Sequence, residues 1–173
     1  KYDEFPGGRY STKQDDFYWS GIAIKKLVHP ESLNEHAVRM VRYPNPIIRL
    51  ADLYLMYAEA YNEYYGPDAE AYRYLNEVRK RAGLPDVETV WSDGTIVKNI
   101  NKHQTQEGLR EIIQAERLIE LSFEGHRYFD LCRWKRAGEF FVSSVKGWNA
   151  RSGRTYEDFY QVTELQARTW ETP

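Results

Sequence analysis

The chain has 173 residues, of which 42% are hydrophobic and 29% are charged. This length and composition fit one globular domain or a compact piece of a larger one, and they exclude collagen-like, wholly disordered and small disulfide-stapled chains. The 24 basic and 26 acidic residues nearly balance, which argues against a nucleic-acid-binding protein. The sequence contains no apolar run of the roughly 20 residues that a membrane span needs.

The two ends of the sequence predict a fragment of a longer protein. Residues 1–6 lack an initiator Met and the basic-then-apolar layout of a signal peptide, and residues 170–173 end without a helix-closing signal. The one cysteine, Cys132, excludes an intrachain disulfide and indicates nothing about the compartment.

Residues 1–46 are predicted to be an irregular lead-in, interrupted by glycine, proline and polar stretches. Within it, 19–28 has the apolar content of a short strand, and 36–43 is a second candidate strand. The residues before Pro44 and Pro46 are biased to extended conformations, so a helix should begin only after Pro46.

The segment 47–65 predicts a helix that is apolar on most of its faces. Such a helix is expected to be buried by neighbours on several sides, and its tyrosines are assigned mainly to helix packing. Its polar residues follow helical spacing and form one narrow stripe: Arg49, Asp52, Glu59 and Glu63.

A turn leads to a second predicted helix over 69–82, with Asp68 as its N-cap. A glycine followed by a proline ends this helix. Ala71, Leu75 and Val78 should face inward, and the mixture of small and large apolar residues has the flavour of a tetratricopeptide repeat. The first hairpin is therefore 47–85.

The rest of the chain predicts a second hairpin and two loop regions. We expect a polar insertion over 86–106 with a small β-hairpin near its centre, then helices over 107–123 and 126–137 separated at Gly125. Residues 138–173 are predicted to be an aromatic-rich loop region. The fold class is all-α: tetratricopeptide-like helical hairpins with long ordered loops and a small β-hairpin, in a single domain or fragment.

The densest charge pattern lies at the second hairpin. Glu116, Glu120 and Glu124 are spaced by four on one helix face that also bears apolar residues. Carboxylates on an apolar face need partners, and Arg127 and Arg133 lie just across the predicted turn. We interpret these five residues as an internal structural brace, because buried ion pairs are usually architectural.

The alternative interpretation is a catalytic carboxylate pair or a carboxylate metal cage. A di-metal site in a helix bundle would place Glu three residues before His126, and that residue is Phe123. The other histidines have no ligand spacing to one another, and no nucleotide-binding or nucleophile-elbow motif occurs. The sequence therefore predicts no metal, no cofactor and no catalytic residue.

The aromatics outside the predicted helices are, as a cluster, candidates for stacking on sugars, although a single loop aromatic more often fills the edge of a core than contacts a ligand. These residues are Tyr10, Tyr18, Trp19, Trp91, Trp148, Tyr156, Tyr160 and Trp170.

Four segments, in order, resemble the SusD/RagB family of outer-membrane nutrient-binding lipoproteins. Residues 49–62 look like the hallmark helix of this family, 75–85 resemble the segment that follows it, and 116–134 are similar to its most recognisable block. The lead-in at 19–26 also resembles the family, so the likeness extends over about 19–136.

This resemblance implies a non-catalytic protein that is tethered by lipid, through an anchor outside this chain, to the surface of a Bacteroidota-type outer membrane. It implies capture of oligosaccharides, or of peptides, for a SusC-like TonB-dependent transporter. Part of the binding platform in resembling proteins lies upstream of the hallmark helix. The candidate ligand-binding residues there are Tyr10, Tyr18, Trp19, Arg9, Asp15 and Asp16.

Two other functions stay open from the residues. One is a helical-repeat module that docks to a protein partner and has no ligand site of its own, and the other is a glycan-cleaving enzyme.

Overall fold

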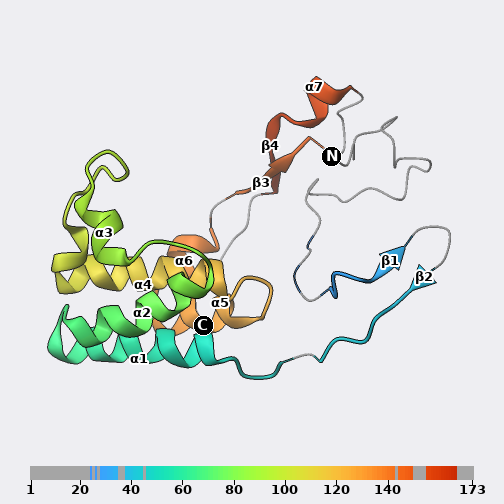
Figure 1. Ribbon diagram of the computed structural model, residues 1–173. Helices are drawn as coiled ribbons and strands as arrows, with labels where there is room; N and C mark the ends of the chain where they lie inside the picture. The colour runs from blue at the N-terminus through green and yellow to red at the C-terminus, as the bar shows by residue number, and fades with distance from the viewer. Residues whose placement is uncertain are drawn as a thin grey trace. The chain divides into compact units, whose positions relative to one another are not determined.

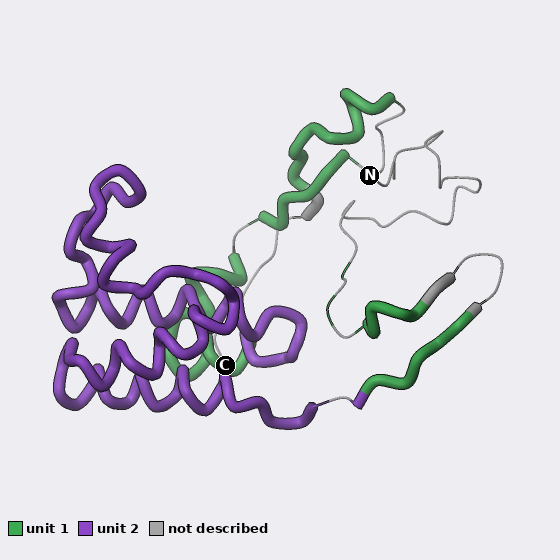
Figure 2. The backbone as a smooth tube through the Cα atoms, in the orientation of Figure 1, with its two compact units in different colours: residues 1–43, 128–173 green, residues 44–127 purple. Residues whose placement is uncertain are grey.

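The computed structural model describes residues 24, 26, 28–34, 38–44, 46–142, 144–149 and 155–166. The chain forms two compact units, one over 44–127 and one that combines 1–43 with 128–173 (Figure 2). Helices dominate, and the described strands form two small antiparallel pairs (Figure 1). The all-α, tetratricopeptide-like fold class is therefore as predicted.

The unit over 44–127 is built on one helix, α1, that packs against two others. Helices α1 and α2 form the first hairpin, and α4 lies against α1. Contacts join the start of α1 to the end of α4 and the end of α1 to the start of α4, so this pair is antiparallel. The elements are α1 (Leu50–Tyr65), α2 (Ala69–Arg81), α3 (Val87–Ser92), the 3₁₀ helix η1 (Lys102–Gln104) and α4 (Gln106–Glu120).

The core of this unit lies where the three long helices meet. The residues predicted to face inward from α2, Ala71, Leu75 and Val78, are buried as expected. They pack with Leu55 of α1 and Ile113 of α4, which are also buried. Each fully buried Leu or Ile contributes roughly 1.5–3 kcal/mol relative to an exposed one, so this cluster stabilises the hairpin far more than helix propensity alone.

Two predicted helix starts are confirmed by their caps. The side chain of Asp68 accepts a hydrogen bond from the N–H of Glu70, and the Thr105 hydroxyl accepts one from the N–H of Gly108. After α4 the chain turns at Gly125, which has a φ of 83°. This left-handed backbone suits glycine and separates α4 from the next helix.

Some predicted helix ends are wrong. Helix α1 begins at Leu50 and not at Ile47, because Arg49 is still extended, with φ −114° and ψ 145°. Helix α4 ends at Glu120 and not at Phe123, since 121–125 form a turn in which Phe123 itself has a φ of 65°.

The β-hairpin predicted within 86–106 is also wrong: this stretch, which the structure describes in full, contains α3 and η1 and no strand. Asn76 of α2 explains why a helix forms here. Its amide oxygen accepts a hydrogen bond from the N–H of Val87 at 2.8 Å, and its amide nitrogen donates to Glu88 at 2.8 Å. These contacts cap the start of α3 from a neighbouring helix.

The other unit contains short helices and two strand pairs. Strands β1 (Leu33–Asn34) and β2 (Val38–Arg39) pair antiparallel, and β2 lies within the predicted strand 36–43. The described residues of 19–28 are not in a strand, and the remainder of that segment lies outside the described residues.

Toward the C-terminus the chain is more regular than the predicted loop region. Strand β3 (Val145–Trp148) pairs antiparallel with β4 (Val162–Gln166), and Phe159 of the helix between them is fully buried. The predicted helix over 126–137 ends early and is followed by a separate short helix. The helices of this region are α5 (His126–Arg133, which begins in the other unit), α6 (Ala137–Phe140) and α7 (Tyr156–Phe159).

Among the described residues, no helix combines the length and the apolar character needed to cross a membrane.

Candidate functional site

The six candidate ligand-binding residues lie outside the described residues, so their placement stays a prediction. These are Tyr10, Tyr18, Trp19, Arg9, Asp15 and Asp16. The glutamates of the predicted structural brace and several of the loop aromatics do lie among the described residues, and their contacts are given below.

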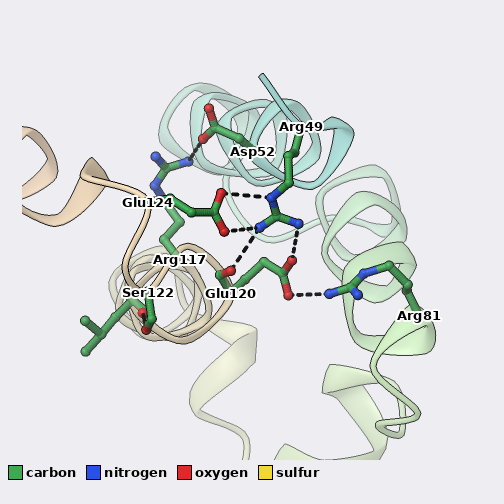
Figure 3. Close-up of polar contacts among 8 residues, drawn as sticks. Arg49, Asp52, Arg81, Arg117, Glu120, Ser122 and Glu124 are labelled. Carbon is green, nitrogen blue, oxygen red and sulfur yellow. Dashed lines mark hydrogen bonds and ion pairs between the residues drawn. The ribbon is translucent and has the colours of Figure 1, made fainter. Parts of the chain in front are cut away.

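Arg49, directly before α1, is clamped by two carboxylates (Figure 3). Its Nε and Nη2 donate to the two oxygens of Glu124 at 2.8 and 2.7 Å, which is the bidentate geometry that a guanidinium and a carboxylate favour. Its Nη1 donates to Glu120 at 2.8 Å. These hydrogen bonds, above all those to Glu124, raise the pKa of Arg49 above its ordinary value.

The same glutamates join α4 to α2. The second oxygen of Glu120 accepts a hydrogen bond from Arg81 at 2.6 Å, and Glu116 forms an ion pair with Arg79. Arg79 is buried, and its Nε also donates to the carbonyl oxygen of Pro85 at 2.8 Å. One set of carboxylates on α4 and the turn after it therefore fixes the end of α2 and the start of α1.

A further ion pair lies deeper between α1 and α4. Arg117 donates to Asp52 at 2.9 Å, and both residues are buried. At the opposite end of the same helix pair, Arg110 makes two hydrogen bonds of 2.6 Å to Glu63. The hydrogen bond to Glu63 is the main reason that the pKa of Arg110 is raised.

The glutamates of the predicted brace form ion pairs with Arg49, Arg79 and Arg81 of the first hairpin. Their pairing with Arg127 and Arg133 across the turn stays a prediction. Arg133 forms an ion pair with Asp130 at 2.9 Å on its own helix, and Arg127 is half-buried at the start of α5. The polar stripe of the first helix was the available signal, because three of its members, Arg49, Asp52 and Glu63, pair with residues of α4 or of the turn that follows it.

This arrangement is suited to holding helices together. A carboxylate that accepts charge-assisted hydrogen bonds from one or two guanidiniums is held in a fixed orientation, and these hydrogen bonds join the elements that carry the partners. Among the described residues, no group of three or more His, Cys, Asp and Glu side chains is placed to hold a metal ion. That the glutamates act as a brace in the energetic sense stays a prediction.

Three of the loop aromatics come together beside β3 and β4. The rings of Trp148 and Tyr160 lie 5.5 Å apart and nearly perpendicular, and Tyr156 lies 4.7 Å from Tyr160. Tyr160 also contacts the buried ring of Phe159. Trp91, in the other unit, packs against the helical core. Trp91 therefore fills the edge of a core, whereas Tyr156 keeps its ring partly exposed.

Only some of the tyrosines of α1 pack within the helical hairpin. Tyr57 lies 4.4 Å from Tyr74 of α2, and Tyr61 lies 4.8 Å from Tyr65. Partial burial raises the pKa of the Tyr57 and Tyr61 phenols. However, Tyr57, Tyr64 and Tyr65 are exposed, so assigning the tyrosines to packing within the hairpin is correct for the inner rings only.

The helical hairpins, joined by arginine–carboxylate pairs, define a tetratricopeptide-like scaffold. Comparison with known proteins gives the family. A sequence model of the SusD family matches residues 1–171, so the chain belongs to the SusD family. The family resemblance predicted from its segments is confirmed.

The relatives are considerably longer than the matched region. SusD-like protein P25 of Formosa agariphila is 46% identical over 88 residues, which are 51% of this chain and 15% of that protein. SusD-like protein P2 of the same bacterium is 39% identical over 94 residues, 54% of this chain and 17% of that protein. A crystal structure of a SusD-like protein from Bacteroides fragilis matches with a TM-score of 0.55 and 32% identity, over 72% of this chain and 20% of that chain.

Proposed function

We propose that this chain is part of a non-catalytic protein that binds oligosaccharide nutrients, or peptides, at the cell surface and delivers them to a SusC-like TonB-dependent transporter. The observation that carries the proposal is the match to the SusD family over 1–171. The protein would act at the outer membrane, held by a lipid anchor outside this chain.

The scaffold supports a binding role over an enzymatic one. Glu116 and Glu120, the carboxylates considered above for a catalytic pair, are each paired with an arginine. An inverting or retaining glycosidase needs two carboxyl groups that flank the scissile bond, whereas these two carboxylates are engaged by Arg79 and Arg49. Affinity would instead come from aromatic rings that stack on sugar faces, with polar neighbours that bind the hydroxyls.

The proposed ligand-facing residues are Tyr10, Tyr18 and Trp19, with Arg9, Asp15 and Asp16 as hydrogen-bonding neighbours. Removing one stacking ring should cost about 1 kcal/mol of binding free energy, which is roughly a fivefold rise in Kd. We expect this for Tyr18→Ala in the full-length protein, measured by calorimetry with the glycan that binds best in a panel. Tyr43→Ala removes an exposed ring from the described part of the lead-in and is the matched control.

One incubation separates the three candidate functions. Full-length protein is mixed with a panel of plant, algal and host oligosaccharides and with peptides, and both bound and soluble material is analysed. Retention of intact ligand supports the proposal. Shortened products that disappear in Glu116→Gln or Glu120→Gln protein would establish an enzyme, and neither retention nor cleavage would favour a docking module. Undiminished affinity in Tyr18→Ala protein would remove that residue from the site.

A further inference from the structure

The structure gathers three aromatic side chains on the β3–β4 hairpin that the sequence lists separately. We refer to Trp148, Tyr156 and Tyr160 as the hairpin aromatic cluster. Trp148 is the last residue of β3, Tyr156 is the first residue of α7, and Tyr160 directly follows α7. The ring of Tyr160 contacts both of the others, with centroids 5.5 Å from Trp148 and 4.7 Å from Tyr156.

The three rings of the cluster are not needed to form the core of the hairpin, because Phe159 already fills it. The side chain of Phe159 is fully buried, whereas that of Tyr156 is 42% exposed. Tyr160 connects the two, since its ring centroid lies 5.1 Å from that of Phe159. Tyr156 is therefore an aromatic ring that is supported from the inside and still presents part of its surface to solvent.

The backbone that carries the exposed ring is held on both sides. The Thr155 hydroxyl accepts a hydrogen bond from the N–H of Asp158 at 3.2 Å, which caps the start of α7. The N–H of Asn149, directly after β3, donates to the carbonyl oxygens of Phe159 and Gln161 at 2.9 and 3.0 Å. Because these contacts fix the short helix against the strand, binding to the ring would lose little conformational entropy.

We propose that the hairpin aromatic cluster is a sugar-stacking site, in which a pyranose ring of an oligosaccharide lies on the ring of Tyr156. Such a ligand packs its C–H groups on an aromatic face while its hydroxyls need hydrogen-bonding partners. The exposed carboxylates of Glu157 and Asp158 follow directly along the chain and can accept hydrogen bonds from hydroxyls. This site is distinct in sequence from the ligand-facing residues proposed above, and it rests on the proposed function because it takes the same class of ligand.

The test places a local probe in the site. Full-length protein with Tyr156→3-fluorotyrosine is titrated with cellohexaose, maltohexaose, laminarihexaose and chitohexaose and followed by fluorine NMR. We expect a saturable shift of the fluorine resonance with at least one of these sugars, and we expect it to persist in a Tyr18→Ala background. Tyr43→3-fluorotyrosine is the matched control, since Tyr43 is 45% exposed and lies outside the cluster. Its resonance should not shift.

Calorimetry in the Tyr18→Ala background then identifies the contacting group. Tyr156→Ala should raise the Kd of the responding hexasaccharide about fivefold, because the stacking ring is lost. Tyr156→Phe keeps the ring face and should change the Kd by less than about twofold. An equal loss of affinity in both variants would overturn the proposal, since the hydroxyl and not the ring would then make the contact.

Three further results would overturn the proposal. If a hexasaccharide binds by calorimetry but leaves the resonance at Tyr156 unchanged, the cluster serves packing or a protein contact, and the proposed function stands. If the Tyr43 probe shifts equally, the response is a general effect of added sugar. If none of the four sugars binds, the sugar-stacking site fails, and the incubation described above decides the proposed function separately.

Discussion

The two ends of the α1–α4 pair are joined by different chemistry. At one end, carboxylates and guanidiniums meet in and beside the core: the side chains of Arg117 and Asp52 are 3% and 11% exposed. At the other end, Asn62 and Gln106 exchange hydrogen bonds between side-chain amides and backbone carbonyls. The ion pair at this second end, Arg110 with Glu63, is 36% and 40% exposed.

This comparison shows that the number of ion pairs is a poor guide to what holds the helices. Charges that are removed from water must keep their partners, because an unpaired buried charge is costly. Charges that remain in water gain little from pairing, since solvent screens them and two long side chains lose freedom. The end with buried pairs should therefore be sensitive to single substitutions, and the other end should tolerate the loss of its ion pair.

The largest effect is expected for Arg117→Ala. It leaves the buried carboxylate of Asp52 without its arginine, and should lower the free energy of unfolding by about 4 kcal/mol. Urea denaturation followed by circular dichroism measures this. The Asp52→Ala, Arg117→Ala double variant should be less destabilised than the sum of the single variants, because neither charge is then left alone. A loss below about 1 kcal/mol in Arg117→Ala would show that the pair behaves like a surface pair.

The parts of this region that could be predicted from sequence are those encoded locally. Asp68 and Thr105 act as caps because a short polar side chain can reach a backbone N–H within three residues, whatever the rest of the chain does. The inward positions of α2, such as Leu75, follow from helical spacing alone. The pairing of β3 with β4 could not be predicted in this way. The two strands are separated along the chain, and no local pattern in either one specifies which strand it pairs with or in which register.

The candidate site shows the same division. The carboxylates of the brace could be found, since three glutamates spaced by four on a partly apolar face need partners. Their partners in the first hairpin, Arg49 and Arg79, could not be found, because these arginines are distant from the glutamates along the chain and only the fold brings them together. That assignment depends on the register of α1 against α4, which no local pattern specifies.

Within the charged end, Glu116 and Glu120 should differ. Glu116→Ala leaves the buried Arg79 unpaired and should cost about 3 kcal/mol. Glu120→Ala should cost less, about 1–2 kcal/mol, because Arg49 keeps its bidentate contact with Glu124. The urea concentrations at the midpoints of unfolding show which variant loses more stability, provided that the dependence of the unfolding free energy on urea is the same in both. If either variant were as stable as the wild type, that glutamate would not be part of a brace, and the reverse order would mean that the Arg49 clamp is the stronger of the two connections.

The smallest effect is expected at the opposite end, for Arg110→Ala. Its ion pair with Glu63 has two short hydrogen bonds, yet both side chains are more than a third exposed. Exposed pairs typically contribute 0–1 kcal/mol, so we expect a loss of about 0.5 kcal/mol at low ionic strength. The loss should shrink further in 1 M salt, where the screening length falls to roughly 3 Å.

Unfolding of the wild type and of Arg110→Ala at low and at high salt measures both quantities. Lys80→Ala, which removes an exposed cation of α2, is the control for a simple change in net charge. A loss near that of Glu116→Ala, unchanged by salt, would mean that the Arg110–Glu63 pair is shielded from water, and the contrast between the two ends would then disappear.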